Sequence, residues 1–229
     1  MIELDHVTRL YGTVLGVNDV CLSLPAGGYG LVGPNGSGKT TLLHLLMGLL
    51  RPSLGTVRVF GQDPERNKAQ LSRIGYCPSL DGLYGPVTGF QWVRYLMELH
   101  GIRRGEAHTR TAALLEQVGM GGAMHRAMGT YSRGMRQRIK LAQAVAHDPE
   151  LLILDEPFNG LDPIARHDIT MWLREWIQDG KSLILASHVL HEVESVTTSF
   201  LLICGGRLLA SGEAQEIHGL LAVVPNDVS

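Results

Sequence analysis

The stretch Gly33-Pro34-Asn35-Gly36-Ser37-Gly38-Lys39-Thr40 decides the fold class. It matches in full the pattern of a glycine, four variable residues and then Gly-Lys-Ser/Thr. The preceding residues, Tyr29 to Val32, have the composition of a short buried strand, and Lys39 to Leu50 have helical length and composition. A strand, a glycine-rich loop and a helix in this order predict an α/β fold built around a phosphate-binding loop.

The residue types of this loop suit phosphate chemistry. Glycines let backbone N–H groups turn inward toward phosphate oxygens, and the helix N-terminus adds a partial positive charge. We expect Lys39 to neutralise the β and γ phosphates and Thr40 to offer its hydroxyl to Mg²⁺. The predicted nucleotide-binding residues of this region are Gly33, Pro34, Asn35, Gly36, Ser37, Gly38, Lys39, Thr40 and Thr41. The alternative is a chance glycine-rich turn, which the flanking strand and helix disfavour.

Two neighbouring carboxylates follow a later apolar run. Leu151 to Leu154 reads as a buried parallel strand, and Asp155 and Glu156 come directly after it. Ligands of open α/β sheets bind at the carboxyl ends of strands. We expect Asp155 to hold Mg²⁺ through its water shell and Glu156 to act as general base for the attacking water. An isolated Asp-Glu pair more often caps a segment or faces solvent, but this one shares its chain with a complete phosphate loop.

The remaining sequence fits one large domain. The chain has 229 residues, of which 45% are hydrophobic and 18% charged, so it can bury a substantial core. A formal net charge of −2 gives no general attraction for nucleic acid, and none is expected as a partner. The three cysteines, Cys21, Cys77 and Cys204, lack the spacing of a zinc site or a disulfide framework and indicate reduced thiols. No apolar window approaches the roughly 20 residues that span a bilayer, and no secretory signal is evident.

Periodicity divides the chain into a sheet-forming core and a helical insertion. Strands are predicted over Ile2 to Val7, Val17 to Leu24, Val57 to Phe60, Arg73 to Cys77, Ser182 to Ala186, Phe200 to Cys204 and Leu208 to Ala210. The first two should form an N-terminal antiparallel sheet. Helices are predicted from Pro64, over Phe90 to His100, Arg110 to Val118, Met135 to His147 and Pro163 to Asp179, and from Glu213. We expect residues of about 1–85 and 148–229 to form the catalytic core and about 86–147 an inserted helical subdomain.

Tyr131-Ser132-Arg133-Gly134-Met135-Arg136-Gln137-Arg138 strongly resembles the signature motif of ABC ATPases, the ATP-binding subunits of ABC transporters. The resemblance covers essentially the whole chain. Gly160-Leu161-Asp162 resembles the D-loop of that family, Ser187-His188 its switch histidine, and Tyr11 stands where the family keeps an aromatic for adenine stacking. The order of five motifs outweighs the ordinary structural explanation of each one taken alone.

The resemblance implies a mechanism in which two ATP molecules lie in a dimer interface. Ser132, Arg133, Gly134 and Met135 of one subunit, with Asp162, would complete the nucleotide site of a second ATP-binding subunit, identical or related. A hydroxyl and backbone N–H groups at a helix start suit a γ-phosphate, and His188 could hydrogen-bond the same phosphate. Lys39, Glu156 and His188 are the expected catalytic residues. The implied place of action is the cytoplasmic face of the cell membrane, beside a permease subunit.

Two departures from the family pattern carry information. The signature form Tyr-Ser-Arg-Gly-Met resembles the branch whose membrane subunits are of the ABC-2 type, which favours export. Ile74 to Ser79 resembles the approach to the Q-loop, but Ser79 stands where a glutamine is usual. Serine is too short to span the same distance to Mg²⁺ and water, so Ser79 is predicted to reach the metal site through a bridging water or to alter coupling.

Other functions remain open at this point. An importer ATPase, a soluble ABC ATPase acting on ribosomes or DNA, and a regulatory nucleotide-binding module without turnover share parts of the pattern. The soluble proteins usually resemble two fused ATPase units or one unit split by a long coiled coil, and this chain resembles neither. The presence of Lys39, Asp155, Glu156 and His188 weighs against a regulatory module, whereas Ser79 leaves that alternative open. The transported substrate is not encoded in these motifs.

Overall fold

The computed structural model describes residues 1–80, 82 and 85–213, which form two compact units. The first unit comprises residues 1–68 together with the chain from Ile184 onward, and the second comprises residues 69–183. β7 (Ser182–Ser187) carries the chain from the second unit into the first. No helix among the described residues is long and apolar enough to cross a membrane.

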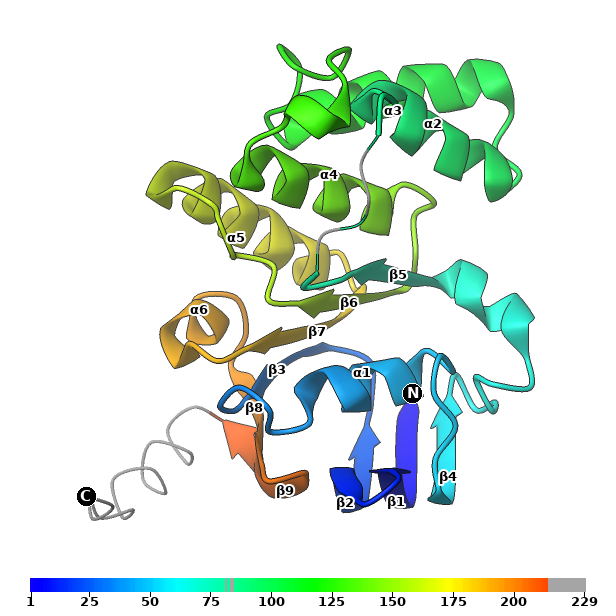
Figure 1. Cartoon of the computed structure of the whole chain (residues 1–229), viewed down its shortest axis with the longest axis vertical. Coiled ribbons are helices and arrows are strands. Elements are labelled where there is room, and N and C mark those ends of the chain that lie inside the picture. Colours follow the sequence, from blue (N-terminus) through cyan, green and yellow to red (C-terminus); the bar gives the residue numbers. More distant parts are fainter. Residues whose placement is uncertain (81, 83–84, 214–229) are drawn as a thin grey trace. The chain divides into compact units, whose positions relative to one another are not determined.

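An antiparallel sheet opens the first unit (Figure 1). β1 (Ile2–Tyr11) lies between β2 (Val14–Leu24) and β4 (Leu54–Val59), and both neighbours run antiparallel to it. Ile2 is paired with residues of both strands and is fully buried, as β-branched side chains in such sheets tend to be. The predicted N-terminal antiparallel sheet is confirmed, and its first strand extends to Tyr11.

The phosphate loop of this unit follows a strand that is paired in parallel. β3 (Gly28–Val32) pairs in parallel with β8 (Ser199–Cys204), and β9 (Arg207–Glu213) adds an antiparallel partner to β8. α1 (Lys39–Leu46) begins where the loop ends. α6 (Leu190–Glu194) packs on β3, and a Cβ on Gly30 would lie 1.9 Å from Cγ1 of Val193, so only glycine permits this approach.

The second unit combines a short parallel sheet with helices. β5 (Ile74–Cys77) pairs in parallel with β6 (Leu151–Asp155), whose five residues are all buried. The α-helices of this unit are α2 (Gly89–Leu99), α3 (Arg104–Gln117), α4 (Arg133–Val145) and α5 (Pro163–Gln178), with the 3₁₀ turn η2 (Met128–Thr130). The 3₁₀ turn η1 (Lys68–Arg73) begins at the last residue of the first unit and continues into the second. Parallel strands with helices in both units, and the antiparallel sheet within the first, confirm the predicted α/β fold.

Residues 86–147 have their own apolar core. Side chains of α2, α3 and α4 meet in one buried cluster that includes Val93, Leu115 and Ile139. α2 begins with a complete capping box, in which the Thr88 hydroxyl accepts from the Gln91 backbone N–H and Oε1 of Gln91 accepts from the Thr88 backbone N–H. The division between a catalytic core and a helical signature subdomain stays a prediction, since the compact units divide the chain at other residues.

Several helix predictions differ from the structure for local reasons. α1 ends at Leu46 rather than Leu50, because Gly48 takes a left-handed conformation (φ 62°) just past the helix. No helix starts at Pro64; the Asp63 carboxylate accepts from the backbone N–H groups of Glu65 and Arg66 and caps a turn that does not continue as a helix. α3 starts at Arg104, before its predicted boundary, and the short helix α6 was not predicted. The helix predicted from Glu213 lies outside the described residues, apart from Glu213 itself, which ends β9.

Candidate nucleotide-binding site

The phosphate loop connects β3 to α1 in the first unit. Nζ of Lys39 donates hydrogen bonds to the carbonyl oxygens of Gly33 at 2.7 Å and Pro34 at 3.1 Å, and only 6% of this side chain is exposed. The Lys39 side chain therefore folds back toward the start of its own loop, and its ammonium lies against the loop backbone. This is where a cation is needed to neutralise phosphate oxygens.

Glycine is required at the end of this loop. Gly38 is the N-cap of α1 with φ 105°, and a Cβ there would lie 2.4 Å from the Gly16 carbonyl oxygen. Gly36 also has a positive φ of 77°, but a Cβ there would meet nothing within 4 Å. Pro34, Asn35, Gly36 and Thr40 are exposed, whereas Oγ of Ser37 is buried without a hydrogen-bond partner among the described residues. A phosphate oxygen is one acceptor that would satisfy this hydroxyl.

Tyr11 lies next to the same loop. Its hydroxyl is 3.4 Å from Oγ1 of Thr41, and the guanidinium of Arg9 lies over its ring at 4.9 Å from the centroid. A Cβ on Gly16 would be 2.8 Å from the Tyr11 ring, so β2 needs a residue without a side chain where it passes this ring. The ring remains 42% exposed. Its place and exposure suit an aromatic that stacks on a base bound near the loop.

His188 follows β7 and is exposed. The residues around it are held by one hydroxyl: Oγ of Ser187 donates to Oε2 of Glu192 at 2.8 Å and accepts from the Val189 backbone at 3.1 Å. Glu192 belongs to α6, so the strand end that carries His188 is fixed to the helix packed on β3. Glu192 was not singled out in the sequence, because a Ser and a Glu five residues apart carry no recognisable signal.

The acidic pair lies at the end of β6 in the second unit. Asp155 is 1% exposed and Glu156 is 8% exposed, and Glu156 adopts a positive φ of 53°. A left-handed conformation is costly for a residue other than glycine and is concentrated at functional sites. Burial is the main cause that raises the pKa of Tyr76, and the charge of Asp155 adds to the shift. Burial also raises the pKa of the Cys77 thiol to about 12, so this cysteine stays protonated beside the carboxylate.

Ser79 contacts one of these carboxylates directly. Its hydroxyl donates a 3.0 Å hydrogen bond to Oδ2 of Asp155, and its carbonyl oxygen accepts from Nζ of Lys140 at 3.3 Å. Lys140 is on α4 and is 2% exposed. Mg²⁺ is bound by oxygen ligands such as carboxylates and hydroxyls, so Asp155 and Ser79 have the chemistry that the predicted metal site needs. Lys140 was not predicted, since a single lysine in a helix usually faces solvent.

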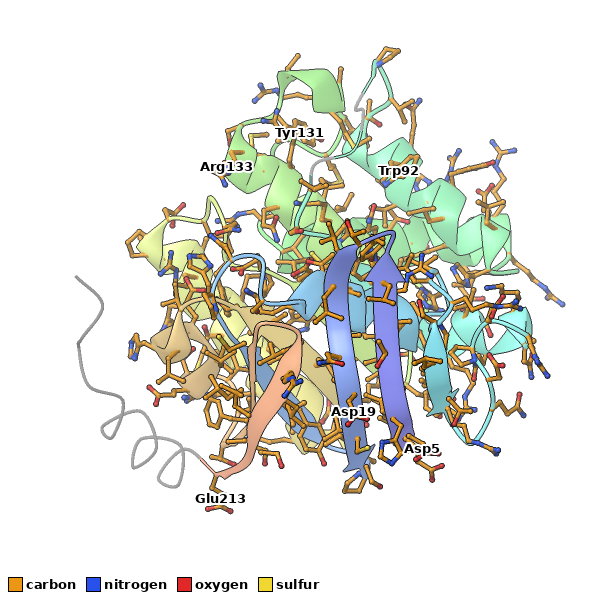
Figure 2. All side chains as sticks on the ribbon, turned by 60° about the horizontal axis from the view of Figure 1, so that its bottom comes forward. Asp5, Asp19, Trp92, Tyr131, Arg133 and Glu213 are labelled. Carbon is orange, nitrogen blue, oxygen red and sulfur yellow. The ribbon has the colours of Figure 1, made fainter. Side chains whose placement is uncertain are left out.

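The signature residues start α4, also in the second unit (Figure 2). Oγ of Ser132 caps the helix by accepting from the Met135 backbone at 3.3 Å. A Cβ on Gly134 would lie 2.9 Å from the Gly160 carbonyl oxygen, and a Cβ on Gly160 would touch the Arg133 side chain. The structure thus brings the signature motif and the D-loop into contact.

A helix cap and an ion pair hold the end of the D-loop in place. Asp162 caps α5 by accepting from the Ala165 backbone at 2.9 Å, and its carboxylate lies 4.0 Å from Nη2 of Arg138. Arg138 also donates to the Val118 carbonyl oxygen at 2.9 Å, so it links this corner to the end of α3. Within the segment from Ser79 to Val87, residues 81, 83 and 84 lie outside the described residues.

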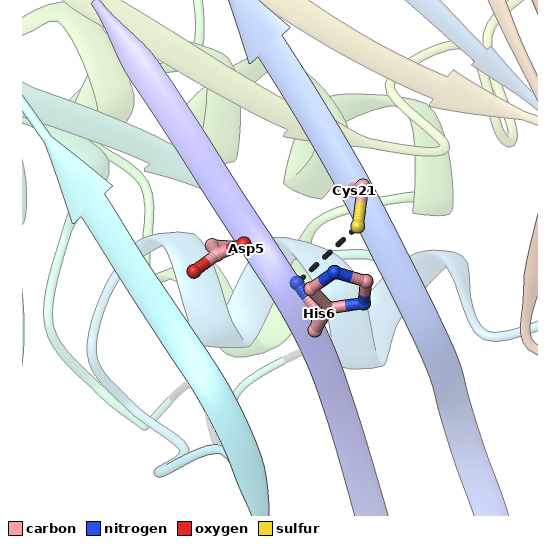
Figure 3. Close-up of side chains that lie close together, drawn as sticks. All are labelled: Asp5, His6 and Cys21. Atoms are coloured by element: carbon pink, nitrogen blue, oxygen red, sulfur yellow. Dashed lines mark hydrogen bonds between the residues drawn. The ribbon is translucent and has the colours of Figure 1, made fainter.

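A second group of polar side chains lies on β1 and β2, where Asp5, His6 and Cys21 approach one another (Figure 3). His6 uses Nδ1 for a 2.7 Å ion pair with Asp19, and its backbone N–H donates to Sγ of Cys21 at 3.3 Å. The bond to Asp19 and its charge raise the pKa of His6. This favours the protonated ring, whereas a metal ligand must be neutral, so the group is better explained as a surface ion pair.

Comparisons with known proteins agree with this geometry. Residues 17–159 match the ABC transporter family. The chain is 37% identical over 221 residues to the bacitracin transport ATP-binding protein BcrA of Enterococcus faecalis, covering 95% of this chain and 71% of that protein. It is 36% identical to the Nod factor export ATP-binding protein I of Cupriavidus pinatubonensis, covering 95% of this chain and 67% of that protein. This chain belongs to the ABC transporter family, as an ATP-binding cassette.

Solved structures agree as well. A structure described as the ATP-binding subunit of an ABC transporter superposes with a TM-score of 0.86 at 26% identity, covering 97% of this chain and 94% of the other. The dimeric bacterial cassette MJ0796 gives a TM-score of 0.85 over 93% of this chain and 98% of the other, and its 21% identity supports the fold alone. The chain spans about two thirds of the length of several of the curated relatives it matches, 67% of the Nod factor protein and 62% of the YxlF protein of Bacillus subtilis.

Proposed function

We propose that this chain is the ATP-hydrolysing subunit of an ABC-2-type exporter. The observation that carries the proposal is the buried pair at the end of β6, Asp155 and Glu156, in a chain that also holds a complete phosphate loop with an inward-turned Lys39. A binding module without turnover has no need of a second buried carboxylate in a strained conformation. Export is supported by the relatives named for bacitracin transport and Nod factor export.

Each residue takes a role that its surroundings support. Lys39 and the N-terminus of α1 bind the β and γ phosphates, with Ser37 and Thr41 beside them, and the exposed ring of Tyr11 stacks on adenine. Thr40 and Asp155 would hold Mg²⁺, which supplies positive charge to the phosphate oxygens, and Ser79 would act on this site through its hydrogen bond to Asp155. Glu156 accepts the proton of the attacking water, and His188 hydrogen-bonds the γ-phosphate.

The site requires a second ATP-binding subunit. The signature residues Ser132 to Met135 form a helix start at which Ser132 and Arg133 are exposed, as expected of a group that completes a neighbour's nucleotide site. ATP binding would close the dimer, hydrolysis would reopen it, and the segment from Ser79 to Val87 would pass the motion to a membrane permease. The protein would then act at the cytoplasmic face of the membrane.

ATP hydrolysis by the purified chain, alone and with its co-expressed permease, tests this proposal. Glu156→Gln should reduce turnover at least about a hundredfold, because it removes the general base, while ATP affinity stays within about threefold. With ATP it should accumulate as a dimer in size-exclusion chromatography. Glu150→Gln is the matched control, since Glu150 lies just before the same strand but forms an exposed ion pair with Arg73. Wild-type protein that binds ATP yet never hydrolyses it, even with the permease, would show a regulatory module instead.

A further inference from the structure

Lys140 is the buried cation of the second unit. Among the described residues of that unit, the buried charged side chains are Lys140, Asp155 and Glu156. Burying an ammonium is costly unless it is compensated by carboxylates or hydrogen bonds. The buried ammonium of Lys140 therefore contributes to the charge balance of the unit that also buries the two carboxylates.

Ser79 connects this lysine to Asp155. Nζ of Lys140 donates to the Ser79 carbonyl oxygen at 3.3 Å, and the Ser79 hydroxyl donates to Oδ2 of Asp155 at 3.0 Å. A single residue links the two hydrogen bonds, so the ammonium lies within about 10 Å of the carboxylate. Both charges also act on the pKa of Cys77, which Asp155 raises and Lys140 lowers, although burial is the larger cause of its shift.

The surroundings keep this arrangement in place. Gln137, one turn before Lys140 on α4, donates to the Pro157 carbonyl oxygen at 2.8 Å and reaches Sγ of Cys77 at 3.6 Å. A cavity beside these residues is lined by Ser79, Leu80, Arg133, Gln137, Lys140 and Asn159. The signature helix therefore contributes a fixed positive charge to the interior next to the strand that carries the acidic pair.

We propose that Lys140 is a positioning residue of the magnesium site, where its buried ammonium offsets part of the Asp155 charge and holds Ser79 against that carboxylate. The inference rests on the proposed function, in which Asp155 holds Mg²⁺. It adds a consequence: a cation this close competes electrostatically with Mg²⁺ and lowers the affinity of the site for the metal. In this chain α4 thereby sets how readily the site takes up magnesium.

Two neutral substitutions separate charge from anchoring. Lys140→Met removes both the charge and the donor to Ser79, whereas Lys140→Gln removes the charge and keeps a donor. With ADP present, Mg²⁺ should raise the melting temperature at a concentration roughly tenfold lower in both variants than in wild type. Lys68→Met is the matched control, because Lys68 also donates to a backbone carbonyl, that of Gly48, and lies in the first unit. Its Mg²⁺ midpoint should be unchanged.

A double-mutant cycle gives a readout without metal or nucleotide. Asp155→Asn removes one buried carboxylate that compensates the ammonium of Lys140 and should lower the melting temperature by about 10 °C. The double variant with Lys140→Met should melt higher than Asp155→Asn alone, because the less well compensated charge is gone. Additive losses in the cycle, or a Mg²⁺ midpoint that neither Lys140 variant moves, would overturn the inference. A shift with Lys140→Met but not Lys140→Gln would also overturn it, since anchoring alone would then suffice.

These measurements do not depend on turnover. Loss of the proposed function would appear as absent hydrolysis in wild-type protein with its permease, whatever the Lys140 variants do. Failure of the inference would appear as unchanged metal midpoints and additive melting temperatures in a protein that still hydrolyses ATP. Because Lys140→Gln is the milder change, it keeps the metal titration available if Lys140→Met or Asp155→Asn does not fold.

Discussion

The hydroxyl of Ser79 lies 3.0 Å from Oδ2 of Asp155 and donates a hydrogen bond to it. A serine at this position therefore acts on the carboxylate itself, at a point where related ATPases are expected to carry a longer glutamine. The bond orients Asp155 and uses one of its oxygen lone pairs. We infer that Ser79 contributes to the metal site through Asp155 rather than by reaching across to Mg²⁺.

Ser79→Ala tests this role. The substitution leaves Oδ2 of Asp155 without its donor, so the carboxylate is less well oriented for Mg²⁺. ATP hydrolysis should fall about three- to tenfold at limiting Mg²⁺ and recover at saturating Mg²⁺. The control is Ser72→Ala, because Ser72 is an exposed serine whose hydroxyl donates to the nearby Ala69 carbonyl oxygen. Identical Mg²⁺ curves for wild type and Ser79→Ala would contradict the assignment.

Two glycines of the phosphate loop make a matched pair. Both have a positive φ, but a Cβ at Gly38 would lie 2.4 Å from the Gly16 carbonyl oxygen, whereas one at Gly36 would meet nothing. Gly36→Ala should cost about 1 kcal/mol of unfolding free energy from backbone strain alone. Gly38→Ala should cost about 2–4 kcal/mol, because strain and overlap with backbone add. Urea unfolding measures both, and equal losses would show that the loop relaxes around Gly38.

The motifs were predictable because each is contiguous in the sequence. Each motif is recognisable within eight or fewer residues: Gly33 to Thr40, Leu151 to Glu156 and Ser132 to Met135. The strand or helix next to each motif follows from composition. The lengths of elements were less predictable where one residue decides them. Gly48, for example, ends α1 although apolar residues continue beyond it.

Contacts between distant segments could not be predicted in this way. Ser79 and Asp155 are 76 residues apart, and Lys140 is 61 residues from Ser79. Nothing in the sequence around Lys140 distinguishes it from a solvent-facing lysine, because burial depends on which side of α4 faces β5. Similarly, the fit of Gly134 against Gly160 depends on a tertiary approach that spacing does not encode.

His147 should make the second unit sensitive to acid. Burial is the main cause that lowers its pKa to about 4, with a smaller effect from His100, which stacks on it at 3.9 Å, while Asp148 acts the other way. Nε2 of His147 lies 3.1 Å from the Ile74 carbonyl oxygen and donates to it from the neutral ring. Below about pH 6.5 His147 takes up a proton in the unfolded chain but not in the folded one. Stability therefore decreases as the pH is lowered from about 6.5 to 4.

The measurement is urea unfolding of wild type and His147→Gln at pH 7.5 and 5.5. Wild type should lose about 1 kcal/mol more than the variant over this interval, because glutamine keeps a donor for Ile74 but does not titrate. His108→Gln serves as a control, since His108 is an exposed histidine of the same unit that contacts Phe90 edge-on. Equal losses in wild type and His147→Gln would show that other groups carry the acid sensitivity.

Tyr11 offers a test of how the base is bound. The ring stands beside Thr41, 42% exposed, with Arg9 over it. Stacking needs the aromatic face but not the hydroxyl, so Tyr11→Phe should keep ATP affinity within about threefold, whereas Tyr11→Ala should weaken it about tenfold. Calorimetric titration with ATP and with triphosphate separates the base from the phosphates, since triphosphate affinity should not respond to either change. Tyr95→Ala, an exposed tyrosine on α2, is the control. If Tyr11→Ala binds ATP as wild type does, adenine stacks elsewhere and Tyr11 serves only to pack the loop.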